Sequence, residues 1–188
     1  MEFTAGFVLT GGQSRRMGRD KALLPIEGSG GPSSLVERTA AHVRAAAGSV
    51  TLIGMPERYA SLGLPVAADI TTGVGPIGGL CTALDITRAE WNLVVACDMP
   101  GVNEAFFRSL IDAACASNAL CLVPETASGL HPLCAVYHRR ARVVVASAIS
   151  HKSFKMHDLL KTLEAAPWPV ADASLLANVN TPLEWGAR

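Results

Sequence analysis

A loop with two adjacent glycines and four basic residues follows the first apolar stretch of the chain. Residues 9–21 read Leu-Thr-Gly-Gly-Gln-Ser-Arg-Arg-Met-Gly-Arg-Asp-Lys. Adjacent glycines let the backbone approach a ligand and aim amide N–H groups at phosphate oxygens, while Arg and Lys neutralise phosphate charge. The pattern therefore predicts a binding loop for a nucleoside triphosphate. The simpler alternative is an ordinary strand-to-helix turn with solvated arginines.

The spacing within this loop excludes two common nucleotide-binding motifs. It fits neither the P-loop pattern G-x-x-x-x-G-K-[ST] nor the dinucleotide fingerprint G-x-G-x-x-G. A Ras-like GTPase and a dehydrogenase are therefore not indicated.

Two aspartates are further candidates for binding chemistry. Asp98 follows the apolar run 93–97, and Asp69 precedes the glycine-rich stretch 71–79. An aspartate at the carboxyl end of a strand can bind magnesium, which takes oxygen ligands and keeps several waters. The alternatives are an aspartate that caps a turn and a glycine-rich stretch that only connects a strand to a helix.

Two asparagines near the end of the chain form a third candidate. Asn178 and Asn180 are separated by one residue, so in an extended segment their amides point to the same side, where they could bind a phosphate or help hold a metal. The alternative is an Asx turn before a short terminal helix that Thr181 caps.

An α/β sheet is needed to bring these residues together. Short apolar runs at 6–9, 50–53 and 91–97 predict buried parallel strands, and the segments 34–47 and 76–88 between them have helical character. Strands that alternate with helices predict right-handed βαβ units and a mostly parallel sheet covered on both faces. In such sheets ligands bind beyond the carboxyl ends of the strands.

The second half of the chain is less regular. The segments predicted to be structured are helices at 103–116, 138–149 and 155–163, strands at 119–123 and 132–137, and a turn or flexible loop at 125–129. No internal repeat or linker is evident, and 188 residues that are 49% hydrophobic suffice for one sizeable core. We therefore expect one domain.

Composition narrows the class of partner. Sixteen basic residues balance sixteen acidic ones, so no overall field attracts nucleic acid or an anionic membrane. The apolar runs fall well short of the roughly 20 residues of a membrane helix, and the first residues lack the basic start of a secretory signal. Five cysteines without a C-x-x-C pair indicate reduced core thiols. We expect a cytoplasmic protein.

The loop at 9–24 closely resembles the G-G-x-S-x-R-M-G-x-D-K motif of the molybdenum cofactor guanylyltransferases. The Asp98 turn and the Asn-Val-Asn-Thr-Pro segment at 178–182 also resemble that family, and the rest of the chain does so more loosely. The segment 52–56 departs from it, because the family member compared has a nucleotide-binding asparagine after the second strand. The resemblance implies a nucleotide-diphospho-sugar transferase-like fold, a single three-layer α/β domain with a mostly parallel, Rossmann-like sheet.

The resemblance also implies roles for individual residues. Lys21 would contact the nucleotide phosphates, Arg16 would hold charge that builds on the leaving pyrophosphate, and Asp98 would bind Mg²⁺. The residues implied to bind the nucleotide are Leu9, Thr10, Gly11, Gly12, Lys21, Asp69, Gly78, Gly79 and Asp98. Those implied to act in catalysis are Arg16, Lys21 and Asp98, and Asp98 would also bind the metal. The acceptor would be bound by His131, Asn178 and Asn180.

The reaction that the resemblance implies is transfer of GMP from GTP to molybdenum-bound molybdopterin, with Mg²⁺ as cofactor and pyrophosphate as product. We expect a nucleotide-binding half at 1–100, an acceptor-binding half at 101–188, and transient contact with molybdenum enzymes or their chaperones. Alternatives are a cytidylyltransferase for the same pterin, a sugar-phosphate nucleotidyltransferase, or a noncatalytic nucleotide- or pterin-binding protein. The Gly11-Gly12 pair favours the guanylyl branch, because the cytidylyl branch more often has Ala-Gly there.

Overall fold

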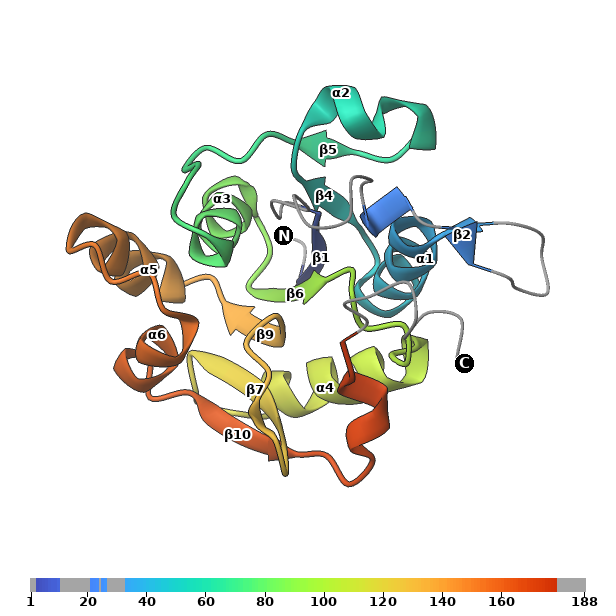
Figure 1. Ribbon diagram of the computed structural model, residues 1–188. Helices are drawn as coiled ribbons and strands as arrows, with labels where there is room; N and C mark the ends of the chain where they lie inside the picture. Colours follow the sequence, from blue (N-terminus) through green and yellow to red (C-terminus); the bar gives the residue numbers. More distant parts are fainter. Residues whose placement is uncertain (1–2, 11–20, 24, 27–32, 179–188) are drawn as a thin grey trace.

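One mixed sheet runs through the part of the chain that the computed structural model describes, residues 3–10, 21–23, 25–26 and 33–178. Within these ranges eight strands form the sheet in the order β10-β7-β9-β6-β1-β4-β5, with β8 paired to β7. The strands are β1 Thr4–Leu9, β4 Thr51–Ile53, β5 Val66–Ala67, β6 Trp91–Ala96, β7 Cys121–Thr126, β8 Gly129–Leu130, β9 Cys134–His138 and β10 Ala166–Pro169. Figure 1 shows the sheet passing through the middle of the molecule from β5 to β10.

The central strands are parallel and buried on both faces. β1 pairs in parallel with β4 and β6, β4 with β5, and β7 with β10, whereas β9 runs antiparallel to β6 and β7. Successive side chains of β1 point to opposite faces, so Val8 packs in one hydrophobic cluster and Phe7 and Leu9 in the other. The predicted mostly parallel sheet is confirmed.

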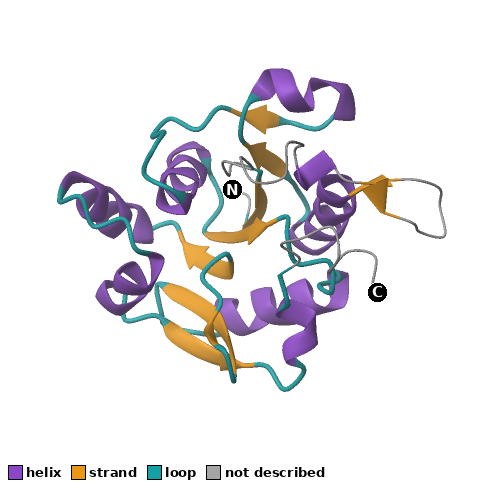
Figure 2. Cartoon of the chain, in the orientation of Figure 1, coloured by secondary structure: helices purple, strands orange, loops and turns teal. Residues whose placement is uncertain are grey.

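Helices cover both faces of the sheet (Figures 1 and 2). α1 (Leu35–Ala47) and α4 (Glu104–Cys115) pack on one face, and α3 (Pro76–Ile86), α5 (Ala141–Ser150) and α6 (Met156–Thr162) pack on the other. Each face therefore has its own cluster of buried apolar side chains. This arrangement confirms the predicted three-layer α/β fold. No helix in the described ranges has both the length and the apolar character that crossing a membrane requires.

Local sequence signals explain where two of the helices begin. At the start of α1 the Ser34 hydroxyl accepts a hydrogen bond from the Glu37 amide, and the Glu37 carboxylate accepts one from the Ser34 amide at 2.8 Å, which forms a capping box. The helix α3 begins with Pro76, whose missing N–H costs nothing in the first helical turn. Both helices start within one residue of the predicted position.

Several short elements complete the described chain. They are the helix α2 (Pro56–Tyr59), the 3₁₀ turns η1 (Lys21–Leu23), η2 (Ala60–Leu62) and η3 (Ala173–Leu176), and the antiparallel pair β2 (Pro25–Ile26) and β3 (Ser33–Ser34). The sequence pattern predicted none of these, and it also missed β5, β8 and β10.

Two boundaries in the second half differ from the prediction. The helix predicted at 138–149 begins only at Ala141, because His138 remains in β9, where it pairs with Trp91 of β6. The segment 125–129, predicted to be a turn or flexible loop, does contain a two-residue turn, but the turn belongs to a hairpin: β7 continues to Thr126, and β8 pairs back on it. The short helix predicted after Thr181 lies outside the described residues.

Candidate active site

The carboxyl ends of β1, β4, β5, β6 and β7 meet at one edge of the sheet, which we call the carboxyl edge. Thr10 follows β1 directly, Asp69 comes two residues after β5, and Asp98 comes two residues after β6. Residues at this edge of a parallel sheet are where open α/β folds bind ligands. The fold thus brings the predicted residues Thr10, Asp69 and Asp98 to one side of the sheet.

The end of β1 is held by three hydrogen bonds. The Thr10 amide and hydroxyl both donate to the Ile53 carbonyl, at 3.0 and 2.9 Å. The Tyr59 hydroxyl donates to the Thr10 carbonyl at 3.2 Å. Leu9 and Thr10 are buried, so packing and these hydrogen bonds hold in place the backbone that is predicted to contact the nucleotide.

The remaining first-loop residues of the prediction are outside the described part of the chain. Gly11, Gly12 and Arg16 fall there entirely, and so does Asn180 near the other end. Lys21 begins η1, but its side chain is not described. The roles predicted for these residues stay predictions.

The Asp69 carboxylate is oriented by its own loop and by α3. Its Oδ1 atom accepts a hydrogen bond from the Thr71 amide at 3.0 Å and lies 3.1 Å from the Thr82 hydroxyl. The same hydroxyl accepts a hydrogen bond from the Ile70 amide at 3.0 Å. The carboxylate is half-buried, so this network fixes its direction at the edge of the sheet.

Gly78 and Gly79 lie in the first turns of α3 and are buried. A Cβ atom on Gly78 would lie 2.2 Å from the Thr71 carbonyl oxygen, and one on Gly79 would lie 3.0 Å from Leu9 Cδ2. The absence of side chains therefore lets α3 approach the Asp69 loop and β1 closely. Contact of these glycines with a nucleotide stays a prediction.

The Asp98 turn is enclosed by elements far apart in sequence. The Arg38 guanidinium of α1 donates a hydrogen bond to the Pro100 carbonyl. On the other side, a Cβ atom on Gly101 would lie 2.9 Å from the carbonyl oxygens of Ser174 and Leu175, so η3 packs directly on the turn. This contact brings the end of the second half to the half-buried Asp98, and the exposed Asn178 follows η3 after one residue.

His131 reaches the carboxyl edge because β9 runs antiparallel to β6. The Ala96 amide at the end of β6 donates to the Leu133 carbonyl at 2.7 Å, two residues after His131. The imidazole Nε2 lies 2.9 Å from the hydroxyl oxygen of Thr126. Burial lowers the pKa of His131 below its usual value, so the ring is neutral at pH 7. A neutral imidazole suits a hydrogen-bonding role at this position.

Comparison with known proteins identifies the family. Residues 6–166 match the model of the MobA-like NTP transferase domain. A relative from Synechococcus elongatus, named "Probable molybdenum cofactor guanylyltransferase", is 32% identical, and the alignment covers 97% of this chain and 96% of the relative. The chain belongs to the MobA-like NTP transferase family. The family indicated by the first loop is thereby confirmed.

Solved structures show the same MobA-like fold. The molybdopterin-guanine dinucleotide biosynthesis protein A from Archaeoglobus fulgidus superposes with a TM-score of 0.80 at 24% identity, covering 97% of this chain and 95% of that one. The Mycobacterium tuberculosis protein Rv0371c in complex with manganese has a TM-score of 0.73 at 19% identity, with 100% and 98% covered. These likenesses support the nucleotidyltransferase fold of this chain.

The donor set at the carboxyl edge bears on metal binding by this MobA-like protein. Among the described residues, no group of three or more His, Cys, Asp or Glu side chains could hold a metal ion. Magnesium is usually bound by one or two carboxylates together with waters and substrate phosphates. A single aspartate such as Asp98, half-exposed at the edge, fits that mode.

The cysteines of this MobA-like protein lie mainly in its core. All five are free, and all but the half-buried Cys115 are buried. Burial raises the pKa of the thiols of Cys121 and Cys134 far above neutrality, so both stay protonated. Their role as core residues agrees with the expectation from sequence.

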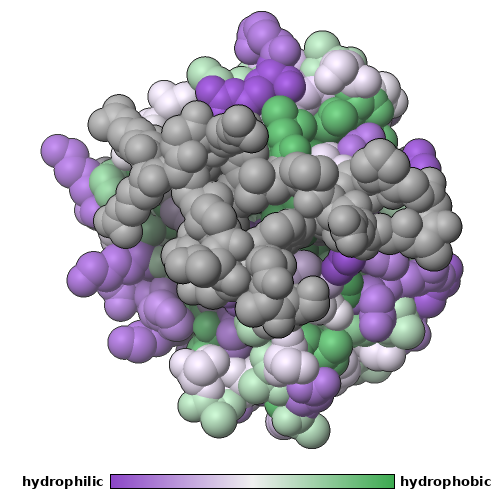
Figure 3. Space-filling model, turned by 45° about the vertical axis from the view of Figure 1, so that its right-hand side comes forward, coloured by the Kyte–Doolittle hydropathy of each residue, from purple (hydrophilic) through white to green (hydrophobic). Residues whose placement is uncertain are grey.

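Exposed apolar side chains also occur at the carboxyl edge. Met55, after β4, is 57% exposed, and Ile70, beside Asp69, is 67% exposed. One face of the molecule, seen in Figure 3, mixes hydrophilic residues with smaller hydrophobic areas. Met55 and Ile70 follow adjacent strands, and exposed apolar side chains of this kind suit contact with a nucleotide base.

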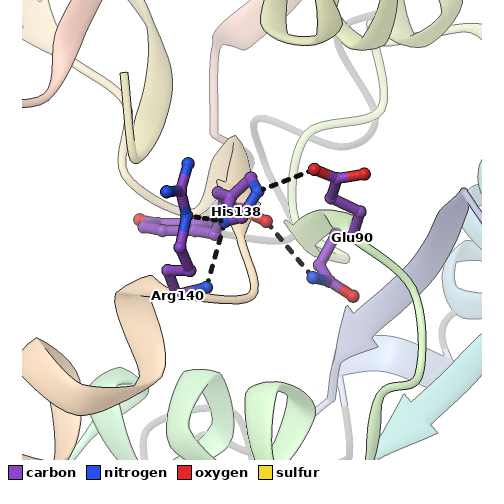
Figure 4. Close-up of polar contacts among 5 residues, drawn as sticks. Glu90, His138 and Arg140 are labelled. Carbon is purple, nitrogen blue, oxygen red and sulfur yellow. Dashed lines mark hydrogen bonds and ion pairs between the residues drawn. The ribbon is translucent and has the colours of Figure 1, made fainter. Parts of the chain in front are cut away.

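A second polar cluster lies at the opposite end of the sheet (Figure 4). His138 Nδ1 accepts a hydrogen bond from the Arg140 amide at 3.1 Å, so Nε2 is the nitrogen that donates to Glu90 Oε1, also at 3.1 Å. The ring also makes an edge contact with Trp91, with centroids 4.8 Å apart. Because Trp91 begins β6 and His138 ends β9, this cluster is far from the carboxyl edge.

Sequence reasoning missed three residues that hold the site in place, namely Arg38, Tyr59 and Thr82. Their partners are 62, 49 and 13 residues away in the chain. Each residue lies within a helix, and no recognisable motif includes it, so the sequence does not mark it. Only the pairing of strands and helices brings each to its partner.

Proposed function

We propose that this protein transfers GMP from GTP to molybdenum-bound molybdopterin, releasing pyrophosphate and forming the guanine dinucleotide form of the molybdenum cofactor. The proposal follows the family of the chain and the name of its Synechococcus relative, which aligns over almost its whole length. The observation that carries it is the meeting of Thr10, Asp69 and Asp98 at one end of the sheet, with Thr10 directly preceding the glycine- and arginine-rich segment in sequence.

The nucleotide-binding half supplies positioning and charge. The fixed backbone at Leu9 and Thr10, continued by Gly11 and Gly12, receives the nucleotide, and Asp69 contacts it from the loop after β5, two strands away from β1. Lys21 and Arg16 neutralise the triphosphate and the departing pyrophosphate. Alignment of the reactants and neutralisation of charge provide the main rate enhancement in such a transfer.

Asp98 is the proposed ligand of a divalent metal ion. Magnesium fits a single carboxylate completed by water and phosphate oxygens, and the manganese complex of Rv0371c is consistent with a divalent ion in this fold. When bound, the ion supplies positive charge and Lewis acidity to phosphate oxygens. The Asp98 turn, clamped by Arg38 and η3, keeps the carboxylate at the edge of the sheet.

The acceptor enters from the side of the second half. Its phosphate is already an anion at neutral pH, so no strong general base is required to make it a nucleophile. The neutral His131, together with Asn178 and Asn180, provides hydrogen bonds that orient the acceptor. The protein also contacts molybdenum enzymes or their chaperones transiently, when the finished cofactor is handed on.

Release of pyrophosphate tests the proposal. GTP, CTP and ATP are supplied separately with Mg²⁺, with and without molybdopterin, to protein shown to be folded. Release only with GTP and molybdopterin supports the guanylyltransferase. Release with CTP would move the protein to the cytidylyl branch, and no release with any nucleotide would leave a binding role as the better account.

A further inference from the structure

We infer that Tyr59 is a positioning residue of the nucleotide site and that it forms, with Thr10 and Gly54, a fitted three-residue contact that sets the end of β1. This inference rests on the proposed function, because it concerns the backbone that receives the nucleotide. Tyr59 contacts no reacting group in this account. It acts through Thr10.

The contact fixes Thr10 from two sides. Its amide and hydroxyl donate to Ile53 of β4, while its carbonyl accepts the Tyr59 hydroxyl of α2. The carbonyl and the following amide belong to one planar peptide group, so the bond from Tyr59 restrains the peptide that leads out of the strand. Tyr59 is only 1% exposed, so water cannot easily replace the Thr10 carbonyl as the acceptor of this hydrogen bond.

Gly54 is the third part of the fit. A Cβ atom at this position would lie 2.1 Å from the Thr10 hydroxyl oxygen and 3.2 Å from Tyr59 Cε2. The Gly54 amide donates to the Ala67 carbonyl at 3.0 Å, so the backbone of Gly54 is itself held in the sheet and does not retreat easily. The Thr10 hydroxyl therefore occupies the space that a side chain at Gly54 would need.

The location of this contact links it to ligand binding. It joins β1, β4 and α2 at the carboxyl edge, where Met55 and Asp69 also lie. A buried hydroxyl that served stability alone would have no influence on affinity for a ligand at this edge. A hydroxyl that sets the direction of the Thr10 peptide changes affinity when it is removed.

The test compares two buried tyrosines. Tyr59→Phe removes the hydroxyl and keeps the ring. Tyr137→Phe is the matched control, because Tyr137 is fully buried and its hydroxyl donates to the Pro132 carbonyl at 2.8 Å. We expect Tyr59→Phe to raise the Kd and KM for GTP about fivefold to tenfold with a smaller change in kcat. The control should lower the melting temperature by a similar amount and leave the Kd for GTP within about twofold.

A second pair of variants tests the fit without changing Tyr59. Gly54→Ala places a methyl group against the Thr10 hydroxyl and should weaken GTP binding. Adding Thr10→Ala to the same chain removes that hydroxyl and should restore much of the affinity, so the double variant binds GTP more tightly than Gly54→Ala alone.

The outcomes separate this inference from the proposed function. If the wild-type chain binds GTP and folded Tyr59→Phe binds it equally well, the positioning role is refuted and the proposed function stands. The positioning role is also refuted if Tyr137→Phe loses as much affinity for GTP as Tyr59→Phe does. It is refuted as well if the effects of Gly54→Ala and Thr10→Ala on GTP affinity simply add in the double variant. Absence of GTP binding by the wild-type chain would overturn both.

Discussion

The two ends of the sheet use polar residues in different ways. At the end formed by Glu90, His138 and Arg140, both imidazole nitrogens of His138 have a partner within the cluster, and the Trp91 ring makes an edge contact with the imidazole. At the carboxyl edge, Thr10 and Asp69 are held from behind by hydrogen bonds, while loops and exposed apolar side chains surround them. Under the proposed function, one end stabilises the fold and the other presents groups to a ligand.

Replacing Asp98 is expected to have the largest effect on activity. Asp98→Asn keeps the size of the side chain and removes the charge proposed to bind the metal, so turnover should fall about 100-fold or more. Lys21→Ala should have an effect of the same order. Circular dichroism and thermal melting should show that both variants stay folded, with melting temperatures within a few degrees of wild type. Near-normal turnover in the folded variants would contradict the roles assigned to these residues.

Crowding the Asp69 loop is expected to have the next largest effect. In Gly78→Ala the new methyl group meets the Thr71 carbonyl, so the loop must shift and carry Asp69 with it. We expect the KM for GTP to rise about tenfold, with a stability cost of roughly 1–3 kcal/mol. Gly48→Ala is the control, because Gly48 has a φ of 81° and open space around it, so its cost is backbone strain far from Asp69. Equal changes in the KM for GTP in the two variants would contradict a role of the Asp69 loop in GTP binding.

Changing the opposite end should affect stability and leave catalysis unchanged. His138→Leu removes the hydrogen bond to Glu90 and leaves the Arg140 amide without its acceptor. The expected cost is roughly 1–3 kcal/mol, or a melting temperature lower by roughly 3–8 °C. KM and kcat for GTP, measured well below the melting temperature, should match wild type. A selective loss of turnover would show that the two ends are not separate in function.

The smallest effect concerns pH. Burial lowers the pKa of His131 in the folded state below its unfolded value of about 6.5, so the unfolded chain binds this proton more readily. The free energy of unfolding should therefore decrease as pH falls from about 6.5 through the folded pKa. The full contribution of His131 should be present at pH values above about 6.5. Urea unfolding between pH 7.5 and 5.5 should show a shallower decrease for His131→Gln than for wild type. An equal or steeper decrease in the variant would contradict this cause.

Much of the fold was predictable because its central elements carry local signals. β1 and β6 contain continuous apolar runs, at 5–9 and 93–96, and the capping residues of α1, Ser34 and Glu37, are only three positions apart in sequence. The edge strand β10 was not predictable, because it contains Pro167 and Pro169, which lack the amide that a central strand needs. β5 has only two residues, too few for a periodic pattern.

Part of the candidate site could be located from the sequence, whereas the side chains that hold it in place could not. Asp98 follows the predicted strand at 91–97, so its place at the carboxyl edge could be deduced from the sequence. Asp69 follows β5, which the sequence pattern did not predict. Tyr59 and Arg38 could not be found in this way, because their hydrogen-bond acceptors are backbone carbonyls in distant turns. Every residue has a backbone carbonyl, so the sequence does not mark which carbonyl will accept a hydrogen bond, and only the folded structure shows it.

The most direct test of the account measures pyrophosphate release from GTP with molybdopterin and Mg²⁺ for wild type, Asp98→Asn and His138→Leu side by side. The three proteins are compared at a temperature at which all are folded. The account predicts release by wild type and His138→Leu at similar rates and a loss of about 100-fold or more in Asp98→Asn. Release by Asp98→Asn at the wild-type rate, or none by wild type, would contradict the claim that the carboxyl edge performs this transfer.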